Sequence, residues 1–280
     1  MNADVKEEPE NRYCPWKSVL IRVHRGDEVF LPKIAIVAAL EREIHPLVKN
    51  WQASAVQHEG RSFTFYESNY AVVVCGGIGS EAARRAAEAA IVKYSPEIII
   101  SAGIAGALVP ELRVGETIFP ARVIDAQDGS RHETAIKNAS VANTPLGRTT
   151  VVSSAEITGI AQKQQLAKSY GAQAVDMESA AVARAAMTHN LRFIAVKSIS
   201  DEHDFEMPEM SQFVRDGQFQ EKRFALHVLL RPWLWLPVLR LARNTKIASE
   251  NLCAWLRESA LTHTIVVSST GEGARASTSD

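Results

Sequence analysis

The chain has 280 residues, of which 46% are hydrophobic and 22% charged, and its formal net charge is -1. This is the balance of an ordinary globular protein, and a net charge so close to zero provides no general attraction to nucleic acid. The three cysteines, Cys14, Cys75 and Cys253, lie too far apart for a disulfide framework or a zinc site, which fits a reducing compartment.

The two ends of the chain differ in composition from its middle. Residues 1–31 form a polar extension with an acidic start, unlike a secretory leader, and Ser18–Val23 is expected to add a short strand. Residues 259–280 carry too few apolar side chains to order themselves, and we predict a disordered tail. Charged residues and prolines interrupt the longest apolar stretch, Phe224–Leu239, so it should not span a membrane. We expect a cytoplasmic protein with one domain over residues 32–258.

Short apolar runs alternate with amphipathic segments through the first part of this domain. The runs are continuously apolar rather than alternating, which is typical of a sheet covered by helices on both faces. We predict an α/β fold with a mixed, largely parallel central sheet flanked by helices. Strands are expected at Lys33–Ala38, Ala71–Cys75, Glu97–Ala102, Thr149–Ser153, Gln173–Val175 and Arg192–Ile199, and helices from about Glu41 and near Ser80–Tyr94, Glu156–Tyr170 and Met177–His189.

Ligands of such folds bind at the carboxyl ends of the strands, which directs attention to polar and glycine residues there. The run Gly76–Gly79 follows the second strand but matches neither a dinucleotide-binding fingerprint nor a phosphate-binding P-loop. It is explained equally well as a tight turn or as an anion cradle at a helix N-terminus.

Three carboxylates, Glu43, Glu178 and Asp201, lie near strand ends and could converge on one pocket. Cleavage of a nucleoside bond needs an acid near the base, a carboxylate near the ribose and a group that orients water. Each residue alone could instead be a solvated carboxylate, and Asp201, after Ser200, could cap a following helix. The residues themselves predict a small-molecule pocket with acidic side chains and leave the reaction open.

Six segments of the chain occur in the order found in one enzyme family. They read KIAIVAALEREI, CGGIGS, IIISAGIAGAL, LRVGE, VDMESAAVA and VKSISD, and they span about Lys33 to Asp204. Each segment alone is only weakly specific for the family, whereas the ordered set is specific. The sequence resembles the nucleoside phosphorylase/nucleosidase superfamily, and within it the 5′-methylthioadenosine/S-adenosylhomocysteine nucleosidases.

This resemblance implies a role for each matching residue. Glu43 would orient or deprotonate the attacking water, and Asp201 would donate a proton to N7 of the purine. Met177 would pack against the ribose, while Glu178 would bind its hydroxyls. An aspartate at position 201 suits adenine, because relatives that act on 6-oxopurines typically have asparagine there. The segment around Ile157 and Thr158 would line the base site.

The chain departs from the family pattern on the side of the attacking water. Ile104 stands where the nucleosidases usually have serine, and Lys197 where they usually have arginine, whose planar fork a lysine does not replace. An arginine that holds phosphate in the phosphorylases is missing near Ser101, which favours hydrolysis. The residues expected to bind substrate on this side are Gly103, Ile104, Ala105, Gly106 and Lys197.

The resemblance therefore implies hydrolysis of a 5′-substituted adenosine to adenine by a homodimer, without cofactor, metal or nucleic acid. One alternative is a phosphorylase of a purine nucleoside, including a lipid-linked adenosine such as adenosylhopane. Another is a non-catalytic nucleoside-binding protein, which the replacements at Ile104 and Lys197 keep open. Retention of Glu43, Glu178 and Asp201 favours an enzyme.

An aromatic, helical extension is predicted from Glu206 to about Glu258, with breaks at Pro232 and Pro237. Its last helix has an apolar stripe that we expect to pack on the sheet. Trp233 and Trp235 lie among leucines and arginines, and three interpretations stay open for them. They could pack in the core or a dimer interface, form an apolar lid over a 5′ substituent, or contact a membrane surface weakly. The stripe comprises Val238, Leu241, Thr245, Ala248, Leu252 and Trp255.

Overall fold

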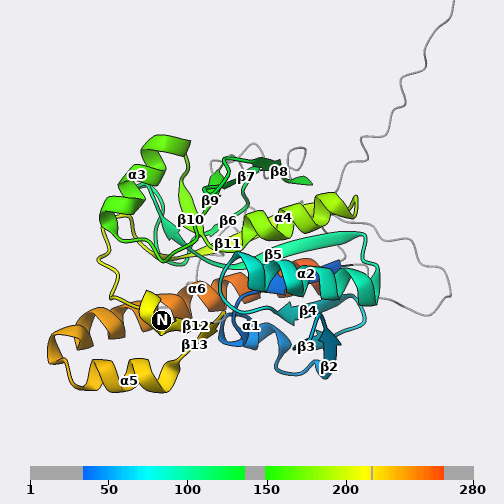
Figure 1. The fold of residues 1–280 in the computed structure, drawn as a ribbon, viewed down its shortest axis with the longest axis horizontal. Coiled ribbons are helices and arrows are strands. Elements are labelled where there is room, and N and C mark those ends of the chain that lie inside the picture. The colour runs from blue at the N-terminus through cyan, green and yellow to red at the C-terminus, as the bar shows by residue number, and fades with distance from the viewer. Residues whose placement is uncertain (1–33, 136–148, 216, 262–280) are drawn as a thin grey trace, which may run out of the picture.

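The structure is a computed structural model that describes residues 34–135, 149–215 and 217–261 (Figure 1). The strand expected at Ser18–Val23 and most of the predicted tail lie outside the described residues. The final helix continues to Leu261, three residues beyond the domain boundary predicted at 258.

An eleven-stranded sheet forms the centre of the fold. Four strands, β1 (Ile34–Ala38), β4 (Ala71–Cys75), β5 (Ile98–Ala107) and β11 (Arg192–Asp201), run parallel to their neighbours in the order β4-β1-β5-β11. β10 pairs antiparallel with the end of β5 and parallel with β9. The prediction of a mixed, largely parallel sheet is confirmed. The other strands are β2 (Gln52–His58), β3 (Arg61–Glu67), β6 (Thr117–Ile118), β7 (Arg122–Asp125), β8 (Arg131–Glu133), β9 (Thr150–Ser153) and β10 (Ala174–Asp176).

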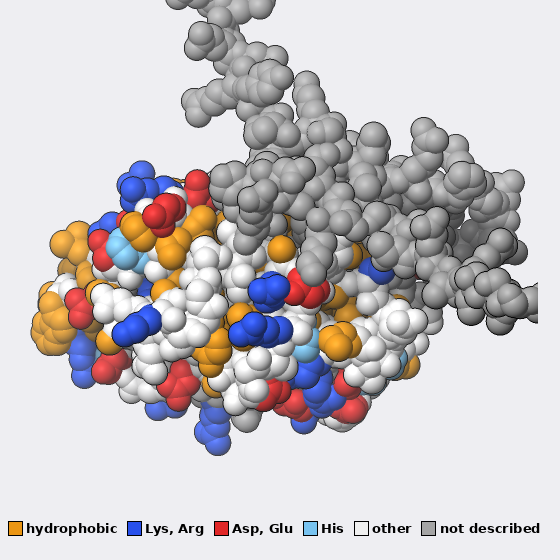
Figure 2. Space-filling model, turned by 90° about the horizontal axis from the view of Figure 1, so that it is seen from above, with side chains coloured by type: hydrophobic (Ala, Val, Ile, Leu, Met, Phe, Trp, Pro, Cys, Tyr) orange, Lys and Arg blue, Asp and Glu red, His pale blue; other side chains and the backbone are white. Residues whose placement is uncertain are grey.

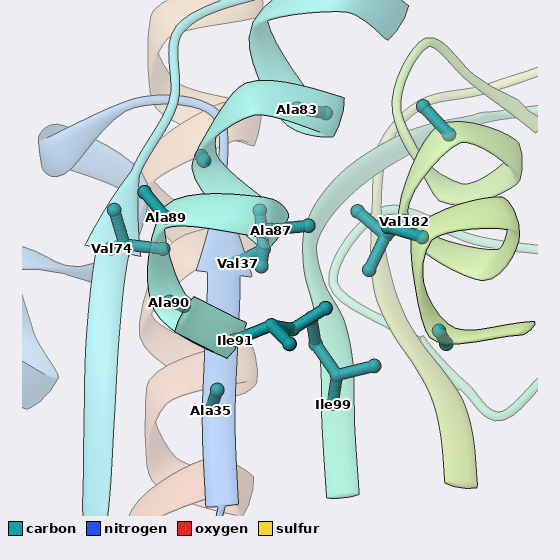
Figure 3. Packing of buried hydrophobic residues seen from close by; sticks show 14 of the residues in the cluster. Ala35, Val37, Val74, Ala83, Ala87, Ala89, Ala90, Ile91, Ile99 and Val182 are labelled. Atoms are coloured by element: carbon teal, nitrogen blue, oxygen red, sulfur yellow. The ribbon is translucent and has the colours of Figure 1, made fainter. Parts of the chain in front are cut away.

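Helices cover both faces of this sheet, which explains why its strands are apolar at consecutive positions. Along β1, Ala35 and Val37 pack in one cluster with α2 and α4, whereas Ile36 and Ala38 pack in another with α1 and α6. Figure 3 shows the first cluster, in which alanines of α2 bring that helix close to the strands. The helices are α1 (Glu41–Val48), α2 (Ser80–Tyr94), α3 (Ile160–Tyr170), α4 (Ser179–Thr188), α5 (Glu221–Leu229) and α6 (Trp235–Leu261).

Two strands extend further than their sequences predicted. β5 does not end at Ala102 but continues through the glycine-containing run to Ala107, and β11 continues to Asp201. The two strands pair over this extension, up to the register of Asp201 with Gly106. The sequence predicted that the strand ends before these glycines, but they lie within it, and the physical reason is that carboxylates pack directly on the strand, as described below.

The C-terminal region is only partly helical. Helix α5 begins at Glu221, so the stretch that starts at Glu206 contains a 3-10 turn at Ser211–Phe213 and the small β12 (Val214–Arg215) and β13 (Gln218–Phe219) instead. A second 3-10 turn, Pro232–Leu234, separates α5 from α6. Pro237 lies inside the first turn of α6 and makes no break, so the hinge is at Pro232 alone.

Helix α6 packs across the sheet with its second half. Ala248, Leu252 and Leu256 are buried there, and Trp255 lies 4.7 Å from Phe119 between ring centroids, so the predicted packing of the stripe is confirmed for this half. No single helix in the described part of the chain is long and apolar enough to cross a membrane. The pair α5 and α6 reaches that length and composition only with a bend of 114° between them.

Candidate active site

A cavity of about 960 Å³ lies at the carboxyl ends of β1, β5 and β11. Its volume is at the upper end of the range for small-molecule sites, roughly 300 to 1,000 Å³. Most of the predicted site residues line it, namely Glu43, Ile104, Ala105, Gly106, Ile157, Thr158, Met177, Glu178 and Asp201. Gly103 and Lys197 do not line the cavity and lie behind its wall.

Glu43 enters the cavity from the first turn of α1, directly after β1. Its side chain is buried, and its backbone carbonyl accepts a hydrogen bond of 2.7 Å from the Ser249 hydroxyl of α6. Burial, reinforced by the charge of Glu178, raises the pKa of Glu43 to about 8, although Lys197 and Arg42 act in the opposite direction. A carboxylate with this pKa is a competent general base near neutral pH.

This raised pKa predicts a pH-dependent stability. The folded state keeps the Glu43 proton up to about pH 8, whereas an unfolded chain releases it near the ordinary value of 4.5. Stability from this group is therefore present at low pH and is lost as pH rises to about 8. We expect Glu43→Gln to gain stability relative to the unmodified protein between about pH 5 and pH 8, measured by urea unfolding. Glu41→Gln, on the same helix, is the control, and an unchanged difference across this range contradicts the prediction.

Lys197 forms a buried ion pair beside Glu43. Its Nζ lies 2.8 Å from Oδ2 of Asp176, and both side chains are almost fully enclosed. Burial opposes both charges, but neighbouring groups together outweigh it. Asp176, Glu178 and Glu43 raise the pKa of Lys197, while Lys197 and the hydrogen bonds from Ser153 and Ser179 lower the pKa of Asp176. Ser153 and the backbone N–H of Ser179 also donate to Asp176. Lys197 is thus a buried counter-charge for the acidic groups, and its placement does not support the substrate contact that we expected of it.

Glu178 is held by the backbone of the glycine-rich turn after β4. The Gly79 N–H donates to its carboxylate at 2.9 Å, and the Met177 N–H does so at 3.3 Å. Gly79 has φ +96°, a conformation that L side chains rarely adopt. Burial and the charge of Asp176 raise the pKa of Glu178. Both of our interpretations describe this turn. A Cβ built at Gly76 would lie 2.8 Å from the Ala86 Cβ of α2, and the Gly79 N–H at the start of that helix binds a carboxylate of the protein itself.

Asp201 is the last residue of β11, and its carboxylate accepts two hydrogen bonds. The Ser200 hydroxyl donates to Oδ1 at 2.6 Å, and the buried ammonium of Lys163 on α3 donates to Oδ2. The next described helical turn begins only at Ser211, so the interpretation of Asp201 as a helix cap is wrong.

Glycines of β5 make room for two of these carboxylates. A Cβ built at Gly103 would lie 3.3 Å from Oε2 of Glu43, and one at Gly106 would lie 2.8 Å from Oδ2 of Asp201. Larger residues at these two positions would displace the acidic groups. The glycine-containing end of β5 is therefore the surface against which the Glu43 and Asp201 carboxylates pack.

Apolar side chains form another part of the cavity wall, which we call the apolar end. They come from the segment after β11, from β13 and α5, and from the first half of α6. The sequence stripe of α6 thus has two roles, because its first half faces the cavity rather than the sheet. The apolar lining residues are Met207, Met210, Phe219, Phe224, Val238 and Leu241.

Comparison with protein families agrees with this geometry. Residues 33–228 match the model of the Phosphorylase superfamily. The chain belongs to this superfamily.

Two relatives within the superfamily illustrate the range of its known members. The 5′-methylthioadenosine/S-adenosylhomocysteine nucleosidase of an Exiguobacterium species is 26% identical over 71% of this chain and 98% of its own length. The aminodeoxyfutalosine nucleosidase of Campylobacter jejuni is 28% identical over 32% of this chain and 41% of its own length.

Solved structures confirm the superfamily fold. A Neisseria meningitidis 5′-methylthioadenosine/S-adenosylhomocysteine nucleosidase in complex with methylthio-immucillin-A has a TM-score of 0.60 at 19% identity, covering 82% of this chain and 98% of its own. The native futalosine hydrolase of Helicobacter pylori has a TM-score of 0.57 at 19% identity, covering 81% and 98%.

The tip between α5 and α6 of this superfamily member is strongly apolar on its surface. Trp233 is 70% exposed and Trp235 47%, and neither lines the cavity, so packing in the core and the lid do not describe them. In Figure 2 orange side chains gather at the end of the molecule where Figure 1 places this tip. A dimer interface and a membrane contact both stay predictions. Other exposed residues here are Leu226, Leu229, Leu230, Leu236 and Leu239.

Lys163 and the apolar end were missed by the sequence reasoning. Lys163 lies between two exposed glutamines on a helix that reads as an ordinary amphipathic one, so it gave no signal. Met207 and Phe219 lie in a segment without regular periodicity. The sequence could at most have pointed to them as apolar residues close behind the candidate acid, Asp201.

Proposed function

We propose that the protein hydrolyses the N-glycosidic bond of a 5′-substituted adenosine and releases adenine. The observation that carries this proposal is the convergence of Glu43, Glu178 and Asp201, from three separate elements, on one cavity. A glycosidic cleavage uses a base for water, a charge for the ribosyl cation and an acid for the leaving group.

Each carboxylate has one step in this mechanism. Asp201 donates a proton to N7 of the purine while the electron pair of the C1′–N9 bond passes to the base. Glu178, fixed by the Gly79 N–H, binds the ribose hydroxyls and stabilises the cationic sugar. Water adds to C1′ and loses a proton to Glu43, whose raised pKa suits that task. Ile157 and Thr158 line the wall where the base would lie, and Met177 the wall beside the ribose.

Hydrolysis rather than phosphorolysis is supported by the charges around the cavity. Arg42 and Lys246 are lining cations, and each is already paired with a glutamate, Arg42 with Glu221 at 3.5 Å and Lys246 with Glu250 at 3.9 Å. The Ser101 hydroxyl is buried and lies 3.2 Å from that of Ser179. Water needs no fixed cation as a partner, whereas a bound phosphate does.

A second candidate function is cleavage of an adenosine with a long apolar 5′ substituent, and one feature of the cavity favours it. Phe219, Phe224 and Leu241 are among the apolar side chains that line the cavity, whose volume is about 960 Å³. A methylthio group is small relative to this volume, and a lipid-linked adenosine would bury far more of it. Relatives named for methylthioadenosine and for aminodeoxyfutalosine show that the substrate varies within the superfamily.

One set of incubations tests both proposals. We expect adenine release from methylthioadenosine in phosphate-free buffer. A 5′-alkylthio-adenosine that carries a chain of about eight carbons should have a higher kcat/KM, because each buried methylene contributes about 0.8 kcal/mol to binding. Chromatography of the products distinguishes the free sugar from a sugar 1-phosphate. Strict dependence on phosphate would make the protein a phosphorylase, binding without turnover would make it a nucleoside-binding protein, and no turnover of the alkyl substrate would exclude the second candidate.

A further inference from the structure

A buried lysine, Lys163, lies against the proposed acid. Its side chain is 1% exposed, in the first turn of α3, whereas Gln162 and Gln164 on either side are exposed. Burying an ammonium is costly unless it is paired and hydrogen-bonded. Here Nζ donates both to Oδ2 of Asp201 and, at 2.7 Å, to the backbone carbonyl of Glu202. The lysine therefore holds the acid and the chain immediately after it.

The space for this pair comes from the glycine of the facing strand. A Cβ built at Gly106 would lie 3.3 Å from Cε of Lys163 and 2.8 Å from Oδ2 of Asp201. The other carboxylate oxygen, Oδ1, accepts the Ser200 hydroxyl. Both oxygens of Asp201 are thus fixed by partners from two different elements, α3 and β11. Such an arrangement orients a reacting group and also surrounds it with fixed charge.

We propose that Lys163 is a positioning residue that makes Asp201 an effective acid, an inference that rests on the proposed function. Both oxygens of Asp201 accept hydrogen bonds in this structure, so its carboxylate takes up a proton from solvent before the reaction. When Asp201 gives this proton to N7, the carboxylate that forms again stands beside the buried Lys163 ammonium. The ammonium keeps its own protons throughout the step and stabilises the charge that develops on Asp201. Because the positive charge is already in place, no solvent has to reorganise as the proton moves.

Replacement of Lys163 by methionine tests this role. We expect kcat for adenine release to fall by about 100-fold, comparable to the loss of one donor to a developing charge. KM should change little, because Lys163 does not line the cavity. Lys168→Met, on the exposed side of the same helix, is the matched control and should keep normal turnover. Normal turnover by Lys163→Met would overturn the proposal.

A double-mutant cycle separates positioning from a loss of folding. In an Asp201→Asn background, Lys163→Met should lower the remaining rate by less than about threefold, because the proposed effect of the lysine on the rate runs through that carboxylate and not through its bond to the Glu202 carbonyl. A further 100-fold loss in this background would refute the proposal. Added methylammonium should restore part of the activity of Lys163→Ala but not of Lys163→Met, whose side chain fills the space. If the unmodified protein releases no adenine at all, the proposed function fails instead, independently of Lys163.

Discussion

Asp201→Asn is expected to lower kcat for adenine release by about two to four orders of magnitude, the usual contribution of a general acid. The asparagine amide has nearly the shape of the carboxyl group but cannot give up a proton to N7. It also leaves the Lys163 ammonium, now paired with Oδ2, without a negative partner. The fall should be measured as steady-state adenine release at saturating substrate, so that a change in binding does not contribute.

A matched control lies three residues further along the chain. The Asp204 side chain is 71% exposed, and Asp204 does not line the cavity, so Asp204→Asn should leave kcat unchanged. If Asp201→Asn turns over at a nearly normal rate, Asp201 is not the acid, and the assignment of adenine as the leaving group loses its main physical support.

Lys197→Met is expected to lower the free energy of unfolding by about 3–5 kcal/mol, the cost of leaving a buried charge unpaired. The Lys197 ammonium is the counter-charge of Asp176, and it also acts on Glu43 and Glu178. Without this ammonium, the buried carboxyl groups of Asp176, Glu43 and Glu178 have no counter-charge. Some of them must then take up protons, or the protein must unfold locally. Urea unfolding at neutral pH measures the loss.

The double variant Lys197→Met with Asp176→Asn tests whether the unpaired charge causes this loss of stability. It removes both charges of the pair, so much of the lost stability should return, whereas a loss equal to that of Lys197→Met would mean that packing of the side chain dominates. Lys168→Met, which removes an exposed lysine, should change the unfolding free energy by less than about 0.5 kcal/mol.

The layered fold could be predicted because a strand that is buried on both faces of the sheet is apolar at consecutive positions of its sequence. A strand such as β1, with Ile36 packed on one side and Val37 on the other, must be apolar throughout. The lengths of β5 and β11 could not be predicted in the same way. Glycine in a run such as Gly103–Gly106 usually indicates a turn, and only the carboxylates that rest on it explain why it stays in the strand.

The sequence predicted the residues of the candidate site that follow a strand. It did not predict Lys163, which a helix supplies. Glu43, Glu178 and Asp201 follow from strand ends and from the ordered motifs. Lys163 could not be found, because a lysine in an amphipathic helix normally faces water and its partner is 38 residues away. Lys197 was noticed, but as a ligand for substrate, since a sequence does not show which of several nearby carboxylates a buried cation joins.

Helix α6 divides its length between two tasks. Its second half is fixed to the protein, where Ser249 binds the backbone of Glu43 and Leu252 is fully buried. In its first half, Val238 and Leu241 line the cavity, and Arg240 lies 3.7 Å from Glu202. Under the proposed function, substitutions of Val238 and Leu241 would alter the accepted 5′ group while Glu43 keeps its position. The helix would then be a place where the substrate range diverges without loss of the reaction.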